Sequence, residues 1–232
     1  MDGPFDVAAL LNNLVPMVSD RLLGRGVDGF DVDRLIMLAA GIDSANFAAT
    51  CMNNVTRYGN AFQLLSQAIA RANPDGLFLE FGVASGTTIN HMAGQLAGKI
   101  YGFDGFEGLP EDWRPGFPTG AFAQTPPAVA ANVELVIGWF NQSLPRFLDT
   151  HTGPVSFMHV DCDLYSSTKT IFDLLGPRIR SGTVIVFDEF FNYPGWRIHE
   201  FKAFMEFVGS YGLKYEYFGM VPSHQQVGVI IK

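Results

Sequence analysis

The sequence has few cysteines and no long apolar run, and these two absences narrow the class of protein. Cys51 and Cys162 are its two cysteines, and neither belongs to a C-x-x-C pair of the kind that binds zinc or exchanges disulfides. No apolar stretch approaches the ~20 residues of a membrane-spanning helix. The N-terminus carries Asp2 and Asp6 where a signal peptide has basic residues. We therefore expect a soluble, cytoplasmic protein in a reducing compartment, with no membrane partner.

Positive charge is also scarce. The chain has 15 Lys and Arg residues against 23 Asp and Glu residues, which gives a formal net charge of −8, and no basic run interrupts this excess. Such a charge balance repels a phosphate backbone, so nucleic acid is not an expected partner. The 232 residues are 48% hydrophobic, enough to bury a full core in a single domain. The expected partner is a small molecule.

The spacing of apolar residues divides the chain into two parts. Over residues 1–72 they recur at helical spacing, which predicts a helical N-terminal segment with a break at Gly24, Gly26 and Gly29. Over residues 73–232, short apolar runs alternate with helical stretches, as in an α/β core. Within this part we predict helices over residues 87–96, 166–175 and 201–208. We predict a long irregular loop over residues 109–131.

Seven apolar runs of the second part predict a mostly parallel seven-stranded sheet. The first five are nearly continuous in hydrophobicity, which is typical of parallel strands covered on both faces. The last two predict an antiparallel C-terminal hairpin at the sheet edge. The seven runs are 77–83, 99–104, 133–138, 155–161, 183–189, 214–218 and 227–231.

The first strand ends in EFGVASGTT, a turn that suits a ligand. In a sheet of this type, ligands bind beyond the carboxyl ends of the strands. Glu80, Gly82, Ser85 and Gly86 lead into a helix whose free N–H groups suit an anion or a carboxylate. Gly82 and Gly86 lack the third glycine of a G-x-G-x-x-G fingerprint, which disfavours a nicotinamide dinucleotide. A tight turn without a ligand is the alternative.

The ends of the second and third strands suit a nucleoside. Asp104 closes the second strand, where an acidic residue can accept the hydroxyl protons of a ribose. A solvated turn aspartate is the alternative. Trp139 follows the third strand, and either a contact with adenine or core packing accounts for it.

Three carboxylates follow the fourth and fifth strands. Asp161 closes the fourth strand, and Asp188 and Glu189 close the fifth. Adjacent parallel strands bring these groups together, so they raise one another's pKa unless a cation compensates. An all-oxygen set suits Mg²⁺, or alternatively Mn²⁺ or Ca²⁺. Helix or loop capping is the alternative for each of the three. Asp163 could be a fourth ligand or a helix cap, and we expect the cap, in the helix for which Ser166 or Ser167 is the other candidate N-cap.

Four stretches taken together resemble the TylF/MycF family of macrocin-type O-methyltransferases, metal-dependent class I enzymes that use S-adenosylmethionine (SAM). These stretches are LEFGVASGTT, YGFDGFEGLPEDW, HVDCDLYSST and GTVIVFDEFFNYPGW. The match spans about residues 77–208 and implies a Rossmann-like class I methyltransferase fold. It also implies that Asp161, Asp188 and Glu189 bind the metal, although the family has two aspartates where this chain has Asp then Glu.

The resemblance assigns the cofactor site as well. The turn after the first strand would line the methionine portion of SAM, and its residues are Glu80, Gly82, Ser85 and Gly86. Asp104 would hold the ribose, and Trp139 would border the adenine.

A bound metal would activate and orient the acceptor hydroxyl, and a general base would assist it. Asp161 and His199 are the candidate catalytic residues, with a surface position at a helix start as the alternative for His199. His159 lies within a buried strand and is better explained as a hydrogen-bond partner in the core than as a base.

We therefore predict a Mg²⁺-assisted, SAM-dependent O-methyltransferase. Its acceptor would be a hydroxyl of a small molecule such as a sugar, a glycosylated natural product or a phenol. In such enzymes the N-terminal segment holds a lid or the contacts of a homo-oligomer. The alternatives are a nicotinamide-dependent oxidoreductase and a SAM-binding regulatory protein without catalysis.

Overall fold

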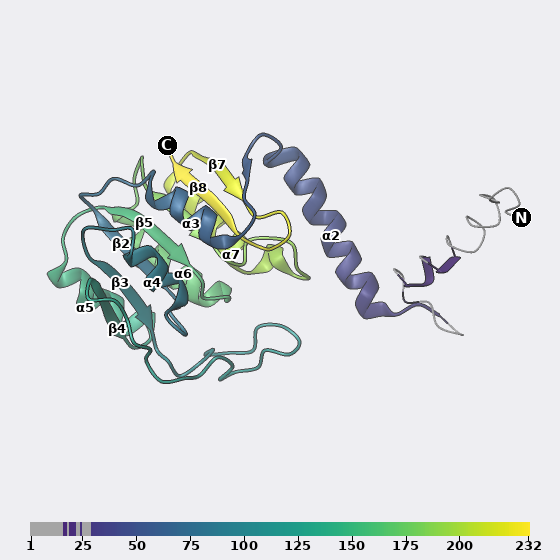
Figure 1. Ribbon diagram of the computed structural model, residues 1–232, viewed down its shortest axis with the longest axis horizontal. Helices are drawn as coiled ribbons and strands as arrows, with labels where there is room; N and C mark the ends of the chain where they lie inside the picture. The colour runs from purple at the N-terminus through teal and green to yellow at the C-terminus, as the bar shows by residue number, and fades with distance from the viewer. Residues whose placement is uncertain (1–15, 18, 22–23, 25–28) are drawn as a thin grey trace, which may run out of the picture.

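The computed structural model describes residues 16–17, 19–21, 24 and 29–232, and its centre is one eight-stranded sheet (Figure 1). The strand order is β1-β7-β8-β6-β5-β2-β3-β4. The strands are β1 (Thr56–Arg57), β2 (Leu77–Phe81), β3 (Ile100–Asp104), β4 (Val133–Ile137), β5 (Val155–Val160), β6 (Val184–Phe187), β7 (Tyr215–Met220) and β8 (Val227–Ile231). β8 is antiparallel to both of its neighbours, and the other pairs are parallel. The predicted α/β fold with a mostly parallel sheet is confirmed.

The seven predicted strands are present, and an eighth lies within the segment predicted to be helical. This extra strand, β1, is two residues long and pairs with β7, where Thr56 lies opposite Gly219. The predicted antiparallel hairpin is also confirmed, and β8 is its inner strand, between β6 and β7. Because β1 is outside β7, the hairpin does not form the edge of the sheet.

Helices cover both faces of the sheet. They are α2 (Val32–Cys51), α3 (Ala61–Ile69), α4 (Thr87–Ala93), α5 (Phe140–Thr150), α6 (Tyr165–Leu175) and α7 (Glu200–Tyr211), with 3₁₀ turns η1 (Gly176–Arg178) and η2 (Trp196–Ile198). On one face, Phe147 of α5, Phe172 of α6 and Phe204 of α7 pack in one core. On the other face, Leu64 of α3 and Ile89 of α4 pack in a second core. The sheet is therefore buried on both sides, as its apolar strands require.

The start of α6 differs from the prediction. α6 begins at Tyr165, and the residue before it makes no side-chain cap, so the expected cap by Asp163, Ser166 or Ser167 is wrong. The reason is that Asp163 adopts a left-handed φ of 65°, which turns the chain before the helix. Ser166 lies in the first helical turn and donates its hydroxyl to Glu111 at 2.5 Å. The predicted end of the helix, before Gly176, is confirmed.

Helix α2 extends away from the body of the molecule (Figure 1). Ser44 is its one buried residue, and large apolar side chains on and next to it are exposed. These are Phe30, Val32, Ile36, Met37, Leu38 and Ile42. The first part of the predicted earlier helix and Gly26 lie outside the described residues, whereas residues 16–17 and 19–21 are helical. The break before α2 is confirmed at Gly24, a turn residue with a φ of 60°, and at Gly29, which lies in a bend. Among the helices that the structure describes, none has both the length and the apolar character that a bilayer crossing requires.

Candidate active site

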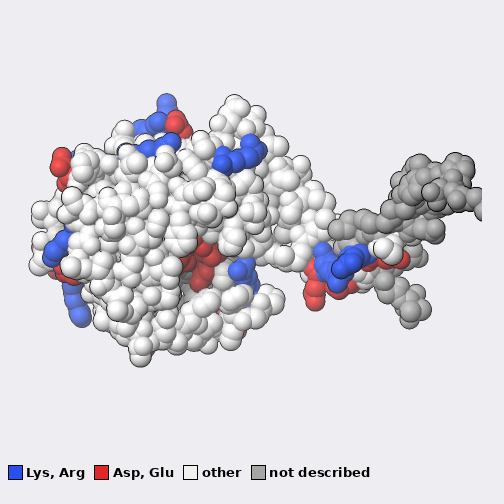
Figure 2. Space-filling view, in the orientation of Figure 1, with Lys and Arg blue, Asp and Glu red and all other residues white. Residues whose placement is uncertain are grey.

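A cavity of about 510 Å³ lies at the carboxyl ends of the parallel strands. Each of five strands supplies a lining residue at or just beyond its end. These are Gly82, Asp104, Trp139, Asp161 and Glu189. In Figure 2 acidic side chains are visible at the bottom of a hollow on this side of the molecule. The cavity is therefore where the sheet topology predicts a ligand site.

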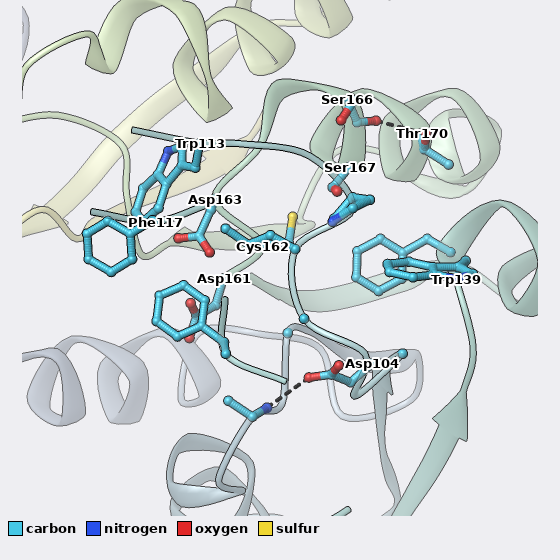
Figure 3. A pocket seen from close by; sticks show the side chains of 18 of the residues that line it. Asp104, Trp113, Phe117, Trp139, Asp161, Cys162, Asp163, Ser166, Ser167 and Thr170 are labelled. Atoms are coloured by element: carbon cyan, nitrogen blue, oxygen red, sulfur yellow. Dashed lines mark hydrogen bonds between the residues drawn. The ribbon is translucent and has the colours of Figure 1, made fainter. Parts of the chain in front are cut away.

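The loop between β3 and β4 forms a wall of this cavity. Leu109, Trp113, Arg114 and Phe117 of the loop line it, opposite Asp104 and Trp139 (Figure 3). The range predicted to be irregular, 109–131, falls within this loop, and the structure gives the loop no helix and only an isolated bridge between Arg114 and Phe117. A long loop at the mouth of a site is a common position for residues that contact substrate.

The turn after β2 is built on a glycine. Gly82 has a φ of 92°, and a Cβ at this position would overlap the carbonyl oxygen of Asp161 at the end of β5. The two strand ends are also joined by a hydrogen bond in which the backbone N–H of Asp161 donates to the carbonyl of Phe81 at 2.8 Å. A residue without a side chain is required here because the two backbones touch.

Asp104 holds the same turn from the end of β3. Its Oδ2 accepts the backbone N–H groups of Val83 and Ala84, each at 2.9 Å, and its Oδ1 accepts that of Phe106 at 2.7 Å (Figure 3). Asp104 therefore fixes the glycine turn against β3 as well as lining the cavity. Its role at the ribose stays a prediction.

The other predicted cofactor residues divide into two groups. Trp139 precedes α5, lines the cavity and lies beside Gly105. The remaining three are not among the lining residues. Ser85 bonds to the hydroxyl of Thr87 at 2.8 Å, and Gly86, with a φ of 78°, opens α4. Glu80 is fully buried below the turn.

Asp161 and Asp188 are brought together by the register of β5 and β6. The backbone N–H of Asp188 donates to the carbonyl of Val160 at 2.9 Å, which places the two aspartates side by side. Among the described residues, ligand atoms of Asp161, Asp188 and His159 all lie within 4.8 Å of one another. Gln226 Nε2 donates to both carboxylate oxygens of Asp188, at 3.1 Å each.

Glu189 is not in this group of ligand atoms. It lines the same cavity as Asp161, and its backbone N–H donates to buried Glu200 at 3.2 Å. Its Oε2 is buried without a hydrogen-bond partner. The structure thus assembles two of the three predicted metal ligands and adds His159, which the sequence analysis assigned to the core.

Burial and mutual repulsion perturb these acids. Burial and the charge of Asp188 raise the pKa of Asp161 well above its usual value. Burial, with Asp188 and Asp161, does the same for Glu189. Burial disfavours the charged form of Asp188 as well, but the nearby imidazole of His159 and the amide of Gln226 lower the pKa of Asp188 overall. The charge on Asp188 is therefore the best compensated of the three.

His199, the other predicted catalytic residue, does not line the cavity. It precedes α7, and its ring lies against those of Tyr193 and Trp113, with centroid separations of 6.3 and 6.4 Å. Its Nδ1 is buried without a partner. Burial, then Arg114, lowers its pKa, so the ring tends to be neutral.

Sequence reasoning missed Arg114. Its guanidinium lies over the rings of Trp113 and Tyr193, 3.8 and 4.8 Å from their centroids, and it lines the cavity near Asp163. Burial raises the pKa of Asp163 to about 7, and the charge of Arg114 opposes that rise. The sequence feature that could have indicated Arg114 is the stretch EDWRPGF, in which an arginine stands between two aromatic residues in a loop beside the predicted site.

Comparisons with known proteins agree with this architecture. Residues 79–190 match the family model described as a methyltransferase domain. The 8-demethyl-8-(2,3-dimethoxy-alpha-L-rhamnosyl)-tetracenomycin-C 4'-O-methyltransferase of Streptomyces olivaceus is 24% identical over 195 residues, which cover 75% of this chain and 69% of the relative. The structure of the O-methyltransferase NovP aligns with a TM-score of 0.58 at 18% identity, over 73% of this chain and 78% of that one. The calicheamicin methyltransferase CalS11 aligns with a TM-score of 0.57 at 20% identity, over 99% and 93%. These structural likenesses show the Rossmann-like methyltransferase fold.

Proposed function

Because the chain is a SAM-dependent O-methyltransferase with a methyltransferase domain over residues 79–190, we propose that it methylates a sugar hydroxyl with the help of a divalent cation. The Streptomyces olivaceus relative is named for a rhamnosyl acceptor. CalS11 is described as a TDP-rhamnose 3'-O-methyltransferase. These names support a deoxysugar, carried by a nucleotide or by a natural product, as the acceptor of this chain.

The observation that carries the proposal is the position of Asp161. It lines the cavity that also holds Asp104 and Trp139, and it belongs to the cluster with Asp188 and His159. One carboxylate therefore faces both the space for the small molecules and the group that could hold a cation. This arrangement suits a reaction in which an acceptor oxygen must be oriented toward a methyl donor.

The residues present fit a divalent cation. Asp161 and Asp188 offer carboxylate oxygens, and the buried Nε2 of His159 has no hydrogen-bond partner. Uncompensated acidic groups at such a depth are unfavourable, and a cation removes the repulsion between them. Asp161 and Asp188 would hold the ion, and Glu189 remains a predicted ligand from the cavity side.

When bound, SAM supplies the methyl group and the cation lowers the pKa of the acceptor hydroxyl. The protein contributes by binding and orienting these groups. Asp104 holds the turn on which the cofactor would lie, and Trp139 offers a ring to the adenine. Trp113 and Phe117 cover the cavity and exclude water, while the Asp161 carboxylate is placed to accept the hydroxyl proton.

The test is methyl transfer from labelled SAM to nucleotide-linked deoxysugars, glycosylated natural products and simple phenols, each with and without a chelator. We expect transfer to a sugar hydroxyl that stops when metal is removed and returns when it is restored. The Asp161→Asn variant should bind SAM but transfer no methyl group, while Asp173→Asn, an exposed change in α6, should behave as wild type. Transfer to phenols alone would contradict the acceptor, and transfer unaffected by the chelator would contradict the metal.

A further inference from the structure

We propose that His159 is a direct ligand of the cation, held in position by Glu80, so that the site has mixed nitrogen and oxygen donors. The inference rests on the proposed function because it concerns the same metal site. It differs from the all-oxygen site that the sequence predicts. It also gives Glu80 a role other than contact with the cofactor.

The register of the sheet places Glu80 and His159 side by side. They are directly opposite each other on the parallel strands β2 and β5. His159 Nδ1 lies 2.9 Å from Glu80 Oε1, and both side chains are fully buried. Such a pair, 79 positions apart in the sequence, orients the imidazole ring within the core.

The hydrogen bond between Glu80 and His159 determines which ring nitrogen of His159 can offer a lone pair on the side of the aspartates. An ionised carboxylate can only accept, so Nδ1 carries the proton that is donated to Glu80. Nε2 is then the nitrogen left for a metal, and a cation bound there would displace any proton that it carries in the ion-free site. A histidine that donates one N–H to a carboxylate while its other nitrogen binds a metal is a recurring arrangement in metalloproteins.

The surroundings of Nε2 fit this role. It is buried and has no hydrogen-bond partner, and it lies 3.7 Å from Asp188 Oδ1, too far for a hydrogen bond. Two neighbouring ligands of one ion with bonds of ~2.1 Å lie about 3.0 Å apart in octahedral geometry and about 3.4 Å apart in tetrahedral geometry. The 3.7 Å between Nε2 and the aspartate is a few tenths of an ångström longer, a distance that a bound ion would close, and Asp161 lies within the same 4.8 Å group.

An imidazole ligand changes the expected metal. Carboxylate and water ligands suit Mg²⁺, Ca²⁺ and Mn²⁺, whereas imidazole suits zinc, copper, iron and nickel. With His159 in the set, Zn²⁺ or Ni²⁺ should bind far more tightly than Mg²⁺. This preference should depend on one side chain.

The experiment uses the full chain loaded with Mn²⁺ and measures nitrogen coupling by electron spin echo envelope modulation. We expect coupling from a directly bound ¹⁴N, which becomes a ¹⁵N signal when only histidine is labelled. Glu80→Gln should keep the coupling and weaken Mn²⁺ binding by about 10- to 100-fold. His159→Gln should remove the coupling and weaken Mn²⁺ binding more than Glu80→Gln does, with a smaller loss for Mg²⁺. His224→Gln, which alters a histidine 2.9 Å from the Gln226 amide and outside the cluster, should keep both.

Bound Mn²⁺ without histidine coupling in the wild-type protein would overturn the inference, even if His159→Gln fails to fold. Coupling that persists in folded His159→Gln would overturn it as well. These readouts are independent of the acceptor. Nitrogen coupling without methyl transfer to any sugar would leave the inference standing and contradict the proposed function. Methyl transfer to a sugar without nitrogen coupling would overturn the inference and leave the proposed function standing.

Discussion

Arg197 and Asp43 form a two-point ion pair that joins η2 to α2 across 154 positions of the sequence. The Nε and Nη2 atoms of Arg197 each lie 2.9 Å from a carboxylate oxygen of Asp43. Beside this pair, Ser44 Oγ accepts the backbone N–H of Asn192 at 3.0 Å. Phe47 packs on Trp196, with ring centroids 5.2 Å apart. The extended helix is therefore attached to the segment that follows the metal-site strand β6.

Replacing Asp43 with Asn should cost little stability. Both partners are about half exposed, so we expect a loss of ~0.2–1 kcal/mol that shrinks at high salt. The hydrogen bond from Arg197 lowers the pKa of Asp43, so its contribution is present at neutral pH and is lost as the pH falls below the ordinary aspartate value of ~3.9. Urea unfolding of both proteins at two pH values and two salt concentrations measures this. A difference that grows on acidification would contradict the assignment.

Replacing Asp104 with Asn should loosen the glycine turn. An amide has one acceptor oxygen where the carboxylate has two, so it can accept either from Val83 and Ala84 or from Phe106, and its NH2 group then faces the remaining donor. We expect a stability loss of about 1–3 kcal/mol, because a part-buried N–H group loses its acceptor, and at least tenfold weaker SAM binding. Denaturant unfolding and calorimetric titration measure the two effects. Asp173→Asn is the matched control, and equal results for both variants would rule out this role for Asp104.

Replacing Trp139 with Ala should weaken cofactor binding without disturbing the metal. Stacking of a base on an aromatic ring contributes about 1–3 kcal/mol, so the SAM dissociation constant should rise roughly 10- to 100-fold. Titration with SAM and with Mn²⁺ separates the two sites. A variant that binds SAM as tightly as wild type would place the adenine elsewhere in the cavity.

Replacing Asp188 with Asn should abolish tight metal binding and leave SAM binding intact. Gln226 already donates to this carboxylate, so the amide of the variant would also face a donor. In the wild type, burial and Asp188 raise the pKa of Asp161, so protons compete with the cation and metal affinity should increase as the pH rises above the ordinary aspartate value of ~3.9. Calorimetric titration over a series of pH values measures both effects. Metal affinity that falls with pH would exclude Asp161 as a ligand.

The sheet and the position of the site could be predicted because they follow from local patterns. Apolar runs of five to seven residues mark strands, and the order of strands and helices brings their ends to one side. Strand β1 could not be found in this way because its two residues, Thr56 and Arg57, are too few to show a repeating pattern of hydrophobicity. The exposed apolar side chains of α2 have the same spacing as buried ones, so the sequence could not tell which face lacks a partner.

The details of the metal cluster depend on register and backbone turns, which no short pattern encodes. The contact between Glu80 and His159 needs the alignment of β2 with β5. The absence of Glu189 from the group of ligand atoms that contains Asp188 depends on the path of the chain beyond the end of β6. Asp163 has a composition typical of a helix cap, and its left-handed backbone overrides that tendency.

The close approach at Gly82 limits how this protein can evolve. A side chain at this position would collide with a carbonyl oxygen of the main chain, at Asp161. That oxygen is common to all twenty amino acids, so no second mutation at residue 161 can make room. Descendants of this sequence can therefore exchange the residues that recognise a substrate, while position 82 has no neutral route to another residue.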